Sequence, residues 1–223
     1  MSLSNADAQK RAAAMQAVKL VEDGMTLGLG TGSTAAWFVT LLGERVQDGL
    51  RVRGVPTSET TAALARQCGI EVIGLDQVGF ETGGRIDLCV DGVDEVDGQN
   101  RAIKGGGGAL LREKIVAAGS DRVVYIADAS KRVETLGAFS LPVEVIPFAV
   151  AFVSSRIAAL GCGPVLRQTA DSAEFRTDEN NVVLDCPFAV IDDPESLAAE
   201  LALIPGVVEH GLFLGMIDEM LFG

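Results

Sequence analysis

The sequence has few of the residues from which metal, disulfide and histidine-based sites are built. It contains four cysteines, one histidine, one tryptophan and one tyrosine among 223 residues. The cysteines form no Cys-x-x-Cys pair and stand mostly among aliphatic residues: Cys68, Cys89, Cys162 and Cys186. This setting is typical of buried, reduced thiols, so we expect neither a zinc site nor disulfides. His210, Trp37 and Tyr125 have no matching partner in any pattern, and we expect them to be packing residues.

Basic residues and long apolar runs are also scarce. The chain has 18 basic and 31 acidic residues, a net charge of −13, which would repel a nucleic-acid backbone. The longest apolar stretch, residues 143–153, is broken by Glu144 and Pro147 and is shorter than a membrane span of about 20 residues. The first 16 residues lack the apolar segment of a signal peptide. We expect a cytoplasmic protein with no nucleic-acid or membrane partner.

Short apolar segments and helical patterns alternate in the first 131 residues. Strands are predicted at 25–30, 51–56, 71–73, 86–90 and 122–127, and helices at 7–22, 35–42 and 62–68. This alternation predicts an α/β fold, a parallel Rossmann-like sheet with helices on both faces. Ligands of such sheets bind at the carboxyl ends of the strands.

The order of elements changes after Lys131. Strands are predicted at 143–146, 165–168, 182–186 and 207–213, and helices at 148–160 and 194–203. This β-α-β-β-α-β order is typical of a smaller ferredoxin-like α+β domain. We predict a catalytic α/β domain of residues 1–131 and 207–223 and a smaller domain of residues 132–206.

The first motif, GLGTGSTA, covers residues 28–35 at the junction of a strand and a helix. Glycines permit a tight turn, and amides and hydroxyls at a helix N-terminus favour an anion such as phosphate. The candidate phosphate ligands are Thr31, Gly32, Ser33 and Thr34. The segment is neither a Walker loop nor a GxGxxG fingerprint. The alternative is a tight turn with a Ser/Thr cap.

The second motif, DGVDEVD, covers residues 91–97 directly after an apolar strand. Carboxylates at a strand end need solvent, a cation or a hydroxylated ligand. Asp91 and Asp94 are therefore candidates for binding sugar hydroxyls. A divalent-metal site is the alternative, although the EF-hand spacing is absent. We expect Glu95 and Asp97 to lie in a solvated acidic turn.

The third motif, KGGGGALLREK, covers residues 104–114. Four consecutive glycines expose their amides to a ligand at a considerable cost in backbone entropy, and Lys104 flanks them. Glu113 falls in the first turn of the following helix, where the dipole favours the ionised form that a general base requires. A flexible surface hairpin is the alternative. A fourth motif, ADASK, places Lys131 after another core strand, although a lone lysine is ordinarily solvated.

These four motifs, in this order and spacing, resemble ribose-5-phosphate isomerase of the A type over essentially the whole chain. The resemblance implies that Glu113 is the base, that Asp91 and Asp94 bind a diol, and that Lys104 supplies a cation beside the glycine loop. It also implies substrate or phosphate contacts from Thr31, Gly32, Ser33, Thr34, Lys131 and Lys10. The family's loop usually reads KGGGAA, so Gly108 departs from the common alanine.

The activity implied is interconversion of D-ribose 5-phosphate and D-ribulose 5-phosphate in the non-oxidative branch of the pentose phosphate pathway. Glu113 would move a proton between C2 and C1, and Lys104 with the amides of Gly105, Gly106 and Gly107 would stabilise the enediolate. Asp91 or Asp94 would assist ring opening or proton shuttling. No metal or cofactor is expected, and a homodimer or larger homo-oligomer is implied.

Two other functions stay open from the sequence alone. One is another enzyme of the wider fold family, such as an amino-sugar phosphate deaminase or a CoA transferase. The other is a catalytically silent sugar-phosphate sensor, which would carry a DNA-binding helix pair or lack the base. The presence of both Glu113 and Lys104 favours the isomerase.

Overall fold

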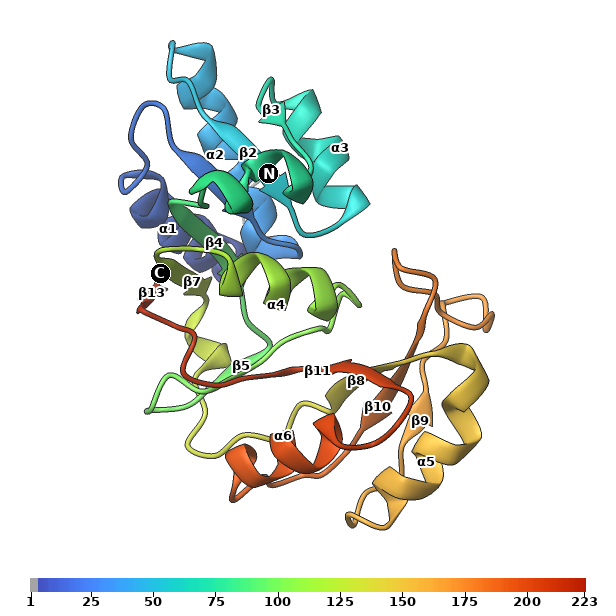
Figure 1. The fold of residues 1–223 in the computed structure, drawn as a ribbon. Coiled ribbons are helices and arrows are strands. Elements are labelled where there is room, and N and C mark those ends of the chain that lie inside the picture. Colours follow the sequence, from blue (N-terminus) through green and yellow to red (C-terminus); the bar gives the residue numbers. More distant parts are fainter. Residues whose placement is uncertain (1–3) are drawn as a thin grey trace. The chain divides into compact units, whose positions relative to one another are not determined.

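The computed structural model describes residues 4–223, which form two compact units (Figure 1). The larger unit contains the chain up to Val93, Arg112–Lys131 and Met216–Gly223. The smaller unit contains Asp94–Leu111 and Arg132–Gly215. No helix within residues 4–223 is both long enough and apolar enough to cross a lipid bilayer.

A six-stranded parallel sheet forms the centre of the larger unit, in the order β13-β7-β4-β1-β2-β3. Its strands are β1 (Thr26–Leu29), β2 (Arg53–Pro56), β3 (Glu71–Val72), β4 (Leu88–Gly92), β7 (Val123–Ala127) and β13 (Glu219–Phe222). Its helices are α1 (Asn5–Val18), α2 (Ser33–Gln47), α3 (Glu59–Gln67) and the 3₁₀ turns η1 (Leu75–Val78), η2 (Phe80–Thr82) and η3 (Ala129–Lys131). Helix α4 (Leu110–Ala118) begins in the smaller unit and continues into the larger one. The predicted α/β class is confirmed.

Helices cover both faces of this sheet. On one face, Leu27 and Leu29 of β1 join a core cluster with Ala13 and Ala17 of α1 and Phe38 of α2. Neighbouring residues of a strand point to opposite faces, so Gly28 faces the other side. A Cβ atom at Gly28 would lie 2.6 Å from a methyl group of Val116 in α4. The glycine therefore allows α4 to pack closely on the second face.

The smaller unit contains two antiparallel sheets. A four-stranded sheet has the order β11-β8-β10-β9, which is the ferredoxin-like arrangement for strands that occur in the chain order β8, β9, β10, β11. A three-stranded sheet has the order β12-β6-β5. The strands are β5 (Glu95–Val96), β6 (Ala102–Ile103), β8 (Leu141–Val145), β9 (Val165–Leu166), β10 (Val182–Cys186), β11 (Val207–His210) and β12 (Leu212–Phe213). The helices are η4 (Pro147–Ala149), α5 (Val150–Ala158) and α6 (Pro194–Ala202).

The two units differ from the predicted division in two segments. Residues 207–215 belong to the smaller unit, because β11 pairs with β8 and β12 pairs with β6. Residues 94–111 also belong to it, because β5 and β6 form one sheet with β12. The last strand, β13, returns to the larger unit and pairs in parallel with β7 (Figure 1).

Candidate functional site

Polar residues follow four neighbouring strands at the carboxyl edge of the larger unit's sheet. Asp128 follows β7, Asp91 is the penultimate residue of β4, Thr31 follows β1 and Thr57 follows β2. Parallel strands end at the same edge, so these side chains belong to one edge of the sheet. This is where ligands of open α/β sheets bind.

Asp91 is buried at this edge and is held by backbone amides. Its Oδ1 atom accepts hydrogen bonds from the amide of Thr31 at 3.0 Å and from the amide of Gly92 at 2.6 Å. A Cβ atom at Gly30 would clash with the Asp91 carboxylate. Gly30 therefore lets the first motif and Asp91 of the second motif approach each other.

The segment from Thr31 to Thr34 forms the turn into α2, as its sequence predicts. Gly32 is the N-cap residue of α2 and has a φ of 105°, a backbone conformation that favours glycine. Ser33 and Thr34 are the first two residues of the helix. The segment presents hydroxyls and amides at a helix N-terminus, where the dipole favours an anion.

A second hydroxyl cluster supports Thr31, and the sequence analysis did not identify it as part of the site. The Thr31 hydroxyl lies 2.7 Å from the Thr57 hydroxyl, 2.9 Å from Ser58 Oγ and 3.2 Å from Thr61 Oγ1. Thr61 also donates to the carbonyl of Gly30 at 2.9 Å. The available signal was the run of hydroxyl residues 57–61 at the start of α3, directly after a strand.

Lys10 contacts the turn into α2, and Lys10 and Lys131 both lie near Asp128. Lys10 of α1 donates to Ser33 Oγ at 3.0 Å. Burial disfavours ionisation of Asp128, but hydrogen bonds from Ser130 and the charges of Lys131 and Lys10 outweigh it, so the pKa of Asp128 is lowered. Lys10 and Lys131 are thus both close enough to act on one carboxylate.

Glu113 is buried in the first turn of α4, as predicted. It and Asp91 lie near the same phenol, that of Tyr125, which stands beside Asp91 on the adjacent strand β7. The pKa of Tyr125 is raised well above its ordinary value, chiefly because the ring is buried, with Cys89, Asp91 and Glu113 adding to the shift. Tyr125 is fully buried and belongs to the packed core, as expected.

Lys104 is the buried cation of the smaller unit. It follows β6, and its amide donates to the carbonyl of Gly211 at 2.9 Å. Its ammonium lies 5.6 Å from the centre of the Phe213 ring, a cation–π distance. His210 is buried as well, and its Nδ1 atom accepts a hydrogen bond from the amide of Leu212 at 3.3 Å, in keeping with a structural role.

The glycine loop of the smaller unit is closed by two hydrogen bonds. The amide of Gly108 donates to the carbonyl of Gly105 at 2.9 Å, and the amide of Gly106 donates to Asp94 Oδ2 at 2.7 Å. Gly106 and Gly107 are exposed, whereas Gly105 and Gly108 are buried. The two central glycines therefore present backbone to solvent, and Asp94 is one of the groups that hold it.

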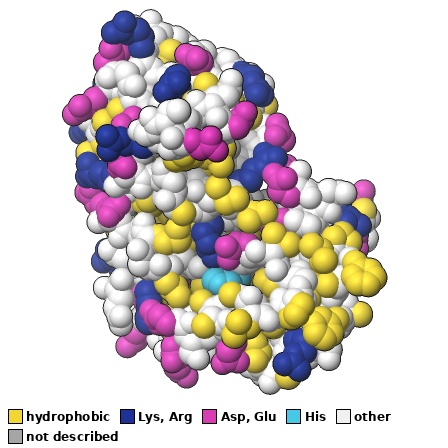
Figure 2. Space-filling model, viewed as in Figure 1, with side chains coloured by type: hydrophobic (Ala, Val, Ile, Leu, Met, Phe, Trp, Pro, Cys, Tyr) yellow, Lys and Arg dark blue, Asp and Glu magenta, His cyan; other side chains and the backbone are white. Residues whose placement is uncertain are grey.

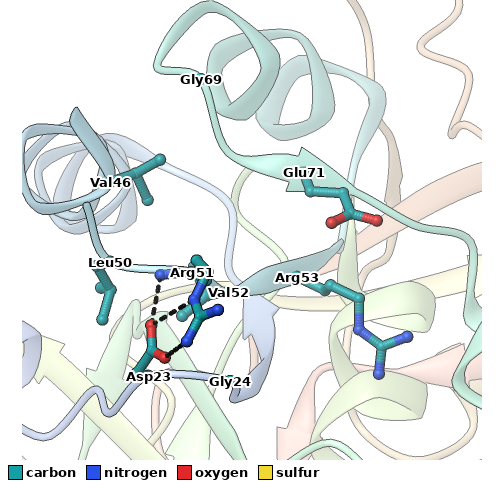
Figure 3. Close-up of a pocket in the computed structure, with 9 residues that line it drawn as sticks. All are labelled: Asp23, Gly24, Val46, Leu50, Arg51, Val52, Arg53, Gly69 and Glu71. Atoms are coloured by element: carbon teal, nitrogen blue, oxygen red, sulfur yellow. Dashed lines mark hydrogen bonds and ion pairs between the residues drawn. The ribbon is translucent and has the colours of Figure 1, made fainter.

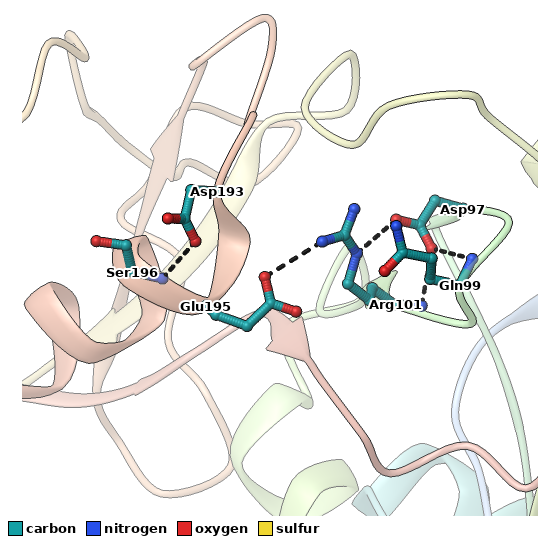
Figure 4. A network of polar contacts seen from close by, with 6 residues as sticks. All are labelled: Asp97, Gln99, Arg101, Asp193, Glu195 and Ser196. Carbon is teal, nitrogen blue, oxygen red and sulfur yellow. Dashed lines mark hydrogen bonds and ion pairs between the residues drawn. The ribbon is translucent and has the colours of Figure 1, made fainter.

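The expectation that Glu95 and Asp97 lie in a solvated turn is wrong. Both are buried. Glu95 accepts hydrogen bonds from the amides of Gly137 and Phe139. Asp97 accepts from the Nε atom of Arg101 at 2.6 Å, and Arg101 also reaches Glu195 at 3.2 Å (Figure 4). The prediction assumed that water would solvate these two carboxylates. In the structure, backbone amides and an arginine bind them instead, so both carboxylates contribute to the stability of the smaller unit.

A separate hollow lies at the opposite, amino edge of the larger unit's sheet. It is lined by residues such as Asp23, Arg51, Arg53 and Glu71, which stand at or before the starts of the strands (Figure 3). Asp23 and Arg51 form an ion pair across it. None of the predicted site residues lines this hollow.

Comparison with known proteins gives one consistent family. The family model for ribose 5-phosphate isomerase A (phosphoriboisomerase A) matches residues 53–223. The chain is 53% identical to ribose-5-phosphate isomerase A of Parvibaculum lavamentivorans, over 98% of this chain and 95% of the relative. It is 55% identical to the Methylorubrum extorquens protein of the same name, over 94% and 89%.

Solved structures agree with these relatives. A D-ribose-5-phosphate isomerase in complex with phospho-erythronic acid superposes with a TM-score of 0.91 at 38% identity, covering 96% of this chain and 93% of the other. Ribose 5-phosphate isomerase from Plasmodium falciparum gives a TM-score of 0.90 at 33% identity, with the same coverage. The chain therefore belongs to the ribose 5-phosphate isomerase A family, and it is an enzyme, an isomerase.

Proposed function

We propose that this enzyme interconverts D-ribose 5-phosphate and D-ribulose 5-phosphate through an enediolate, with Glu113 as the general base. The observation that carries the proposal is a buried carboxylate at a helix N-terminus: Glu113 lies in the first turn of α4 and is 4% exposed. The helix dipole favours its ionised form. Burial also strengthens the electrostatic interactions of Glu113 with a bound substrate.

The reaction moves one proton between adjacent carbons. Glu113 takes the proton from C2 of the open aldose, and the electron pair left behind forms the C1–C2 double bond as the carbonyl oxygen becomes an oxyanion. Return of the proton to C1 gives the ketose. A carboxylate is a weak base toward carbon, so the oxyanion must be stabilised as it forms.

Lys104 and the loop amides of Gly105, Gly106 and Gly107 are the proposed oxyanion donors. Lys104 is a buried cation, and Gly106 and Gly107 expose their backbone. The related isomerase in complex with phospho-erythronic acid supports a phosphorylated sugar as the ligand. That ligand is a phosphorylated sugar acid whose planar carboxylate carries two oxygens on one carbon, much as an enediolate carries two oxygens on adjacent carbons.

The remaining substrate groups are assigned to the other predicted residues. The turn of Thr31, Gly32, Ser33 and Thr34, with Lys10 and Lys131, binds the phosphate, because amides, hydroxyls and cations meet there at the N-terminus of α2. Asp91 and Asp94 accept hydrogen bonds from sugar hydroxyls, and one of them assists ring opening.

A coupled assay for ribulose 5-phosphate formed from ribose 5-phosphate tests the proposal. We expect turnover by the purified enzyme, in the presence of a chelator as well as in its absence, since lysine and amide donors take the place of a Lewis acid. Absence of turnover on ribose 5-phosphate would refute the substrate. Turnover lost on chelation and restored by Mg²⁺ or Mn²⁺ would instead make Asp91 and Asp94 metal ligands.

We also propose that the enzyme is a homodimer or larger homo-oligomer. The smaller unit exposes large apolar side chains around α5 and α6, among them Phe148 at 98%, Leu203 at 81% and Phe152 at 52% (Figure 2). Phe152 and Leu203 line one hollow. Apolar surface of this kind is typical of contacts between proteins. Light scattering after gel filtration would give the mass of a single chain if the proposal is wrong.

A further inference from the structure

Arg167 is a nearly buried arginine of the smaller unit with two sets of partners. Its Nε and Nη2 atoms donate to the two carboxylate oxygens of Asp185, at 2.9 and 2.5 Å. Its Nη1 atom donates to the carbonyls of Gly105 and Gly106, at 2.9 and 3.2 Å. The side chain is 12% exposed. The carboxylate fixes the guanidinium plane, and the guanidinium then holds the glycine loop.

These contacts set the direction of the loop's N–H groups. The N–H of Gly106 shares a peptide plane with the carbonyl of Gly105, and in a trans peptide the two point in opposite directions. The same holds for the N–H of Gly107 and the carbonyl of Gly106. With both carbonyls held by Arg167, both N–H groups point away from the guanidinium, and that of Gly106 reaches Asp94 at 2.7 Å.

Phe175 holds the other end of the loop. Its amide donates to the carbonyl of Arg167 at 3.0 Å, so the two residues are cross-strand neighbours. Its ring centre lies 5.6 Å from the Arg167 guanidinium carbon. The ring also lies against Gly108, where an added Cβ atom would clash with it. The hairpin that carries Arg167 and Phe175 therefore contacts the glycine loop at three of its four glycines.

We propose that Arg167, whose guanidinium is fixed by Asp185 and lies near Phe175, is a positioning residue for the loop amides: it holds the Gly106 amide on Asp94 and directs the Gly107 amide toward the developing oxyanion. The inference rests on the proposed function, in which those amides stabilise the enediolate. Glycines have the freest backbone of all residues, so a loop of four needs an external constraint to keep one arrangement. Arg167 provides that constraint without touching the substrate.

The test compares Arg167→Met with Arg176→Met. Arg176 is an exposed arginine of the same segment that pairs with Glu174 and donates to the carbonyl of Asn180. We expect kcat of Arg167→Met to fall about 10- to 100-fold, because misplaced donors lose stabilisation of the transition state. KM should change by less than about twofold, since the proposed phosphate ligands are untouched. Affinity for phospho-erythronic acid should fall together with kcat, and Arg176→Met should match the wild type.

Hydrogen exchange of the loop amides gives a readout that does not depend on activity. Exchange at residues 105–108 should be faster in Arg167→Met than in Arg176→Met. Asp185→Asn keeps Arg167 but weakens its anchor, so smaller changes in the same direction are expected. Loop exchange and kcat both unchanged in Arg167→Met, with only a lower melting temperature, would overturn the inference. Faster loop exchange in an enzyme that does not isomerise ribose 5-phosphate would uphold the positioning and refute the proposed function.

Discussion

Two of the carboxylates proposed for catalysis, Asp91 and Glu113, are buried, and buried charge is costly unless it is hydrogen-bonded or paired. Asp91 meets this requirement with the amides of Thr31 and Gly92. The sequence located Asp91 and Glu113 because each follows a recognisable strand or glycine loop. It did not reveal their neighbours, because Gly30 and Tyr125 come from other strands and meet them only after folding.

Replacing Glu113 with glutamine tests the base directly. Glutamine keeps the size of the side chain but has no basic oxygen, so turnover should fall by about a hundredfold to ten-thousandfold while KM stays near its original value. Steady-state kinetics in the coupled assay measures both. Glu59→Gln is the matched control, because Glu59 is exposed and pairs with Arg112. Its kinetics should equal those of the wild type.

Solvent deuterium provides a second measurement on the same pair of variants. In deuterated water the wild type should put deuterium into the sugar, since a carboxylate that holds a proton between transfers can exchange it with water. Glu113→Gln should not. Near-normal turnover and incorporation in Glu113→Gln would make another group the base, with Asp91 or Asp94 next to be tested.

Gly30→Ala should damage the site without replacing any proposed catalytic residue. The added methyl group would clash with the Asp91 carboxylate, so Asp91 must move away from the amide of Thr31. We expect kcat/KM to fall by about tenfold or more, since a small displacement of an active-site group lowers the reaction rate strongly. Gly98→Ala is the control, because nothing lies within 4 Å of a Cβ atom there. Equal kinetics for the two variants would show that activity does not depend on the close approach of Gly30 to Asp91.

At the scale of elements, the longer helices and strands could be predicted because each carries its own periodic pattern. Strand β10 spans the residues predicted from its apolar run, Val182–Cys186. Strands β5 and β6 were missed, since each has two residues and no pattern of its own, and β11 and β12 were predicted as one strand over residues 207–213. They exist because residues distant in the chain pair with one another, and a single sequence does not show that pairing.

The N-cap residue of helix α3, Ser58, also contacts Thr31 of the proposed phosphate site. Ser58 accepts from the amide of Thr61 at 3.1 Å and from the Thr31 hydroxyl at 2.9 Å. Ser58→Ala should lower the free energy of unfolding by about 1 kcal/mol through the lost cap. It should also raise KM for ribose 5-phosphate, because Thr31 loses one of its supports. Urea unfolding and steady-state kinetics measure the two effects.

The matched control removes the cap of a different helix, α6. Asp193 caps α6 by accepting from the amide of Ser196 at 2.9 Å (Figure 4). Asp193→Ala should cost about the same stability as Ser58→Ala but leave KM unchanged. If KM rises in both variants, the cause is a general loss of stability. If KM is unchanged in Ser58→Ala, the hydroxyl cluster is not part of the substrate site.

At the scale of the whole molecule, the two fold types were predicted correctly from element order. The limits of the units follow from pairings between distant segments, such as β12 with β6 and β13 with β7. The predicted division has crossings after Lys131 and after residue 206, whereas the chain passes between the units after Val93, Leu111, Lys131 and Gly215. Arg167 was missed for the same reason, since its partners Gly105 and Asp185 are far from it in sequence.

Stability of the molecule should depend on pH through Glu144, a carboxyl that the proposed chemistry does not use. Glu144 lies in β8, is 1% exposed, and accepts from Thr177 Oγ1 and Asn181 Nδ2 at 2.9 Å each. Its pKa is raised, chiefly by burial; the two hydrogen bonds oppose the shift, and the charges of Glu179 and Glu209 add to it. The folded protein therefore binds this proton more tightly than the unfolded chain does.

A carboxyl with a raised pKa stabilises the fold fully below its unfolded pKa, about 4.3, and this contribution is lost as the pH rises through the folded pKa. Glutamine stays neutral and can still accept from Thr177 and Asn181. Glu144→Gln should therefore be more stable than the wild type at pH 8, by about 1.4 kcal/mol for each unit by which the pKa is raised, and the gain should vanish toward pH 4. Urea midpoints at several pH values measure it, with the exposed Glu200→Gln as control. A gain that is the same at pH 4 and pH 8 would come from packing, and a loss at pH 8 would mean that the ionised carboxylate is favoured in the fold.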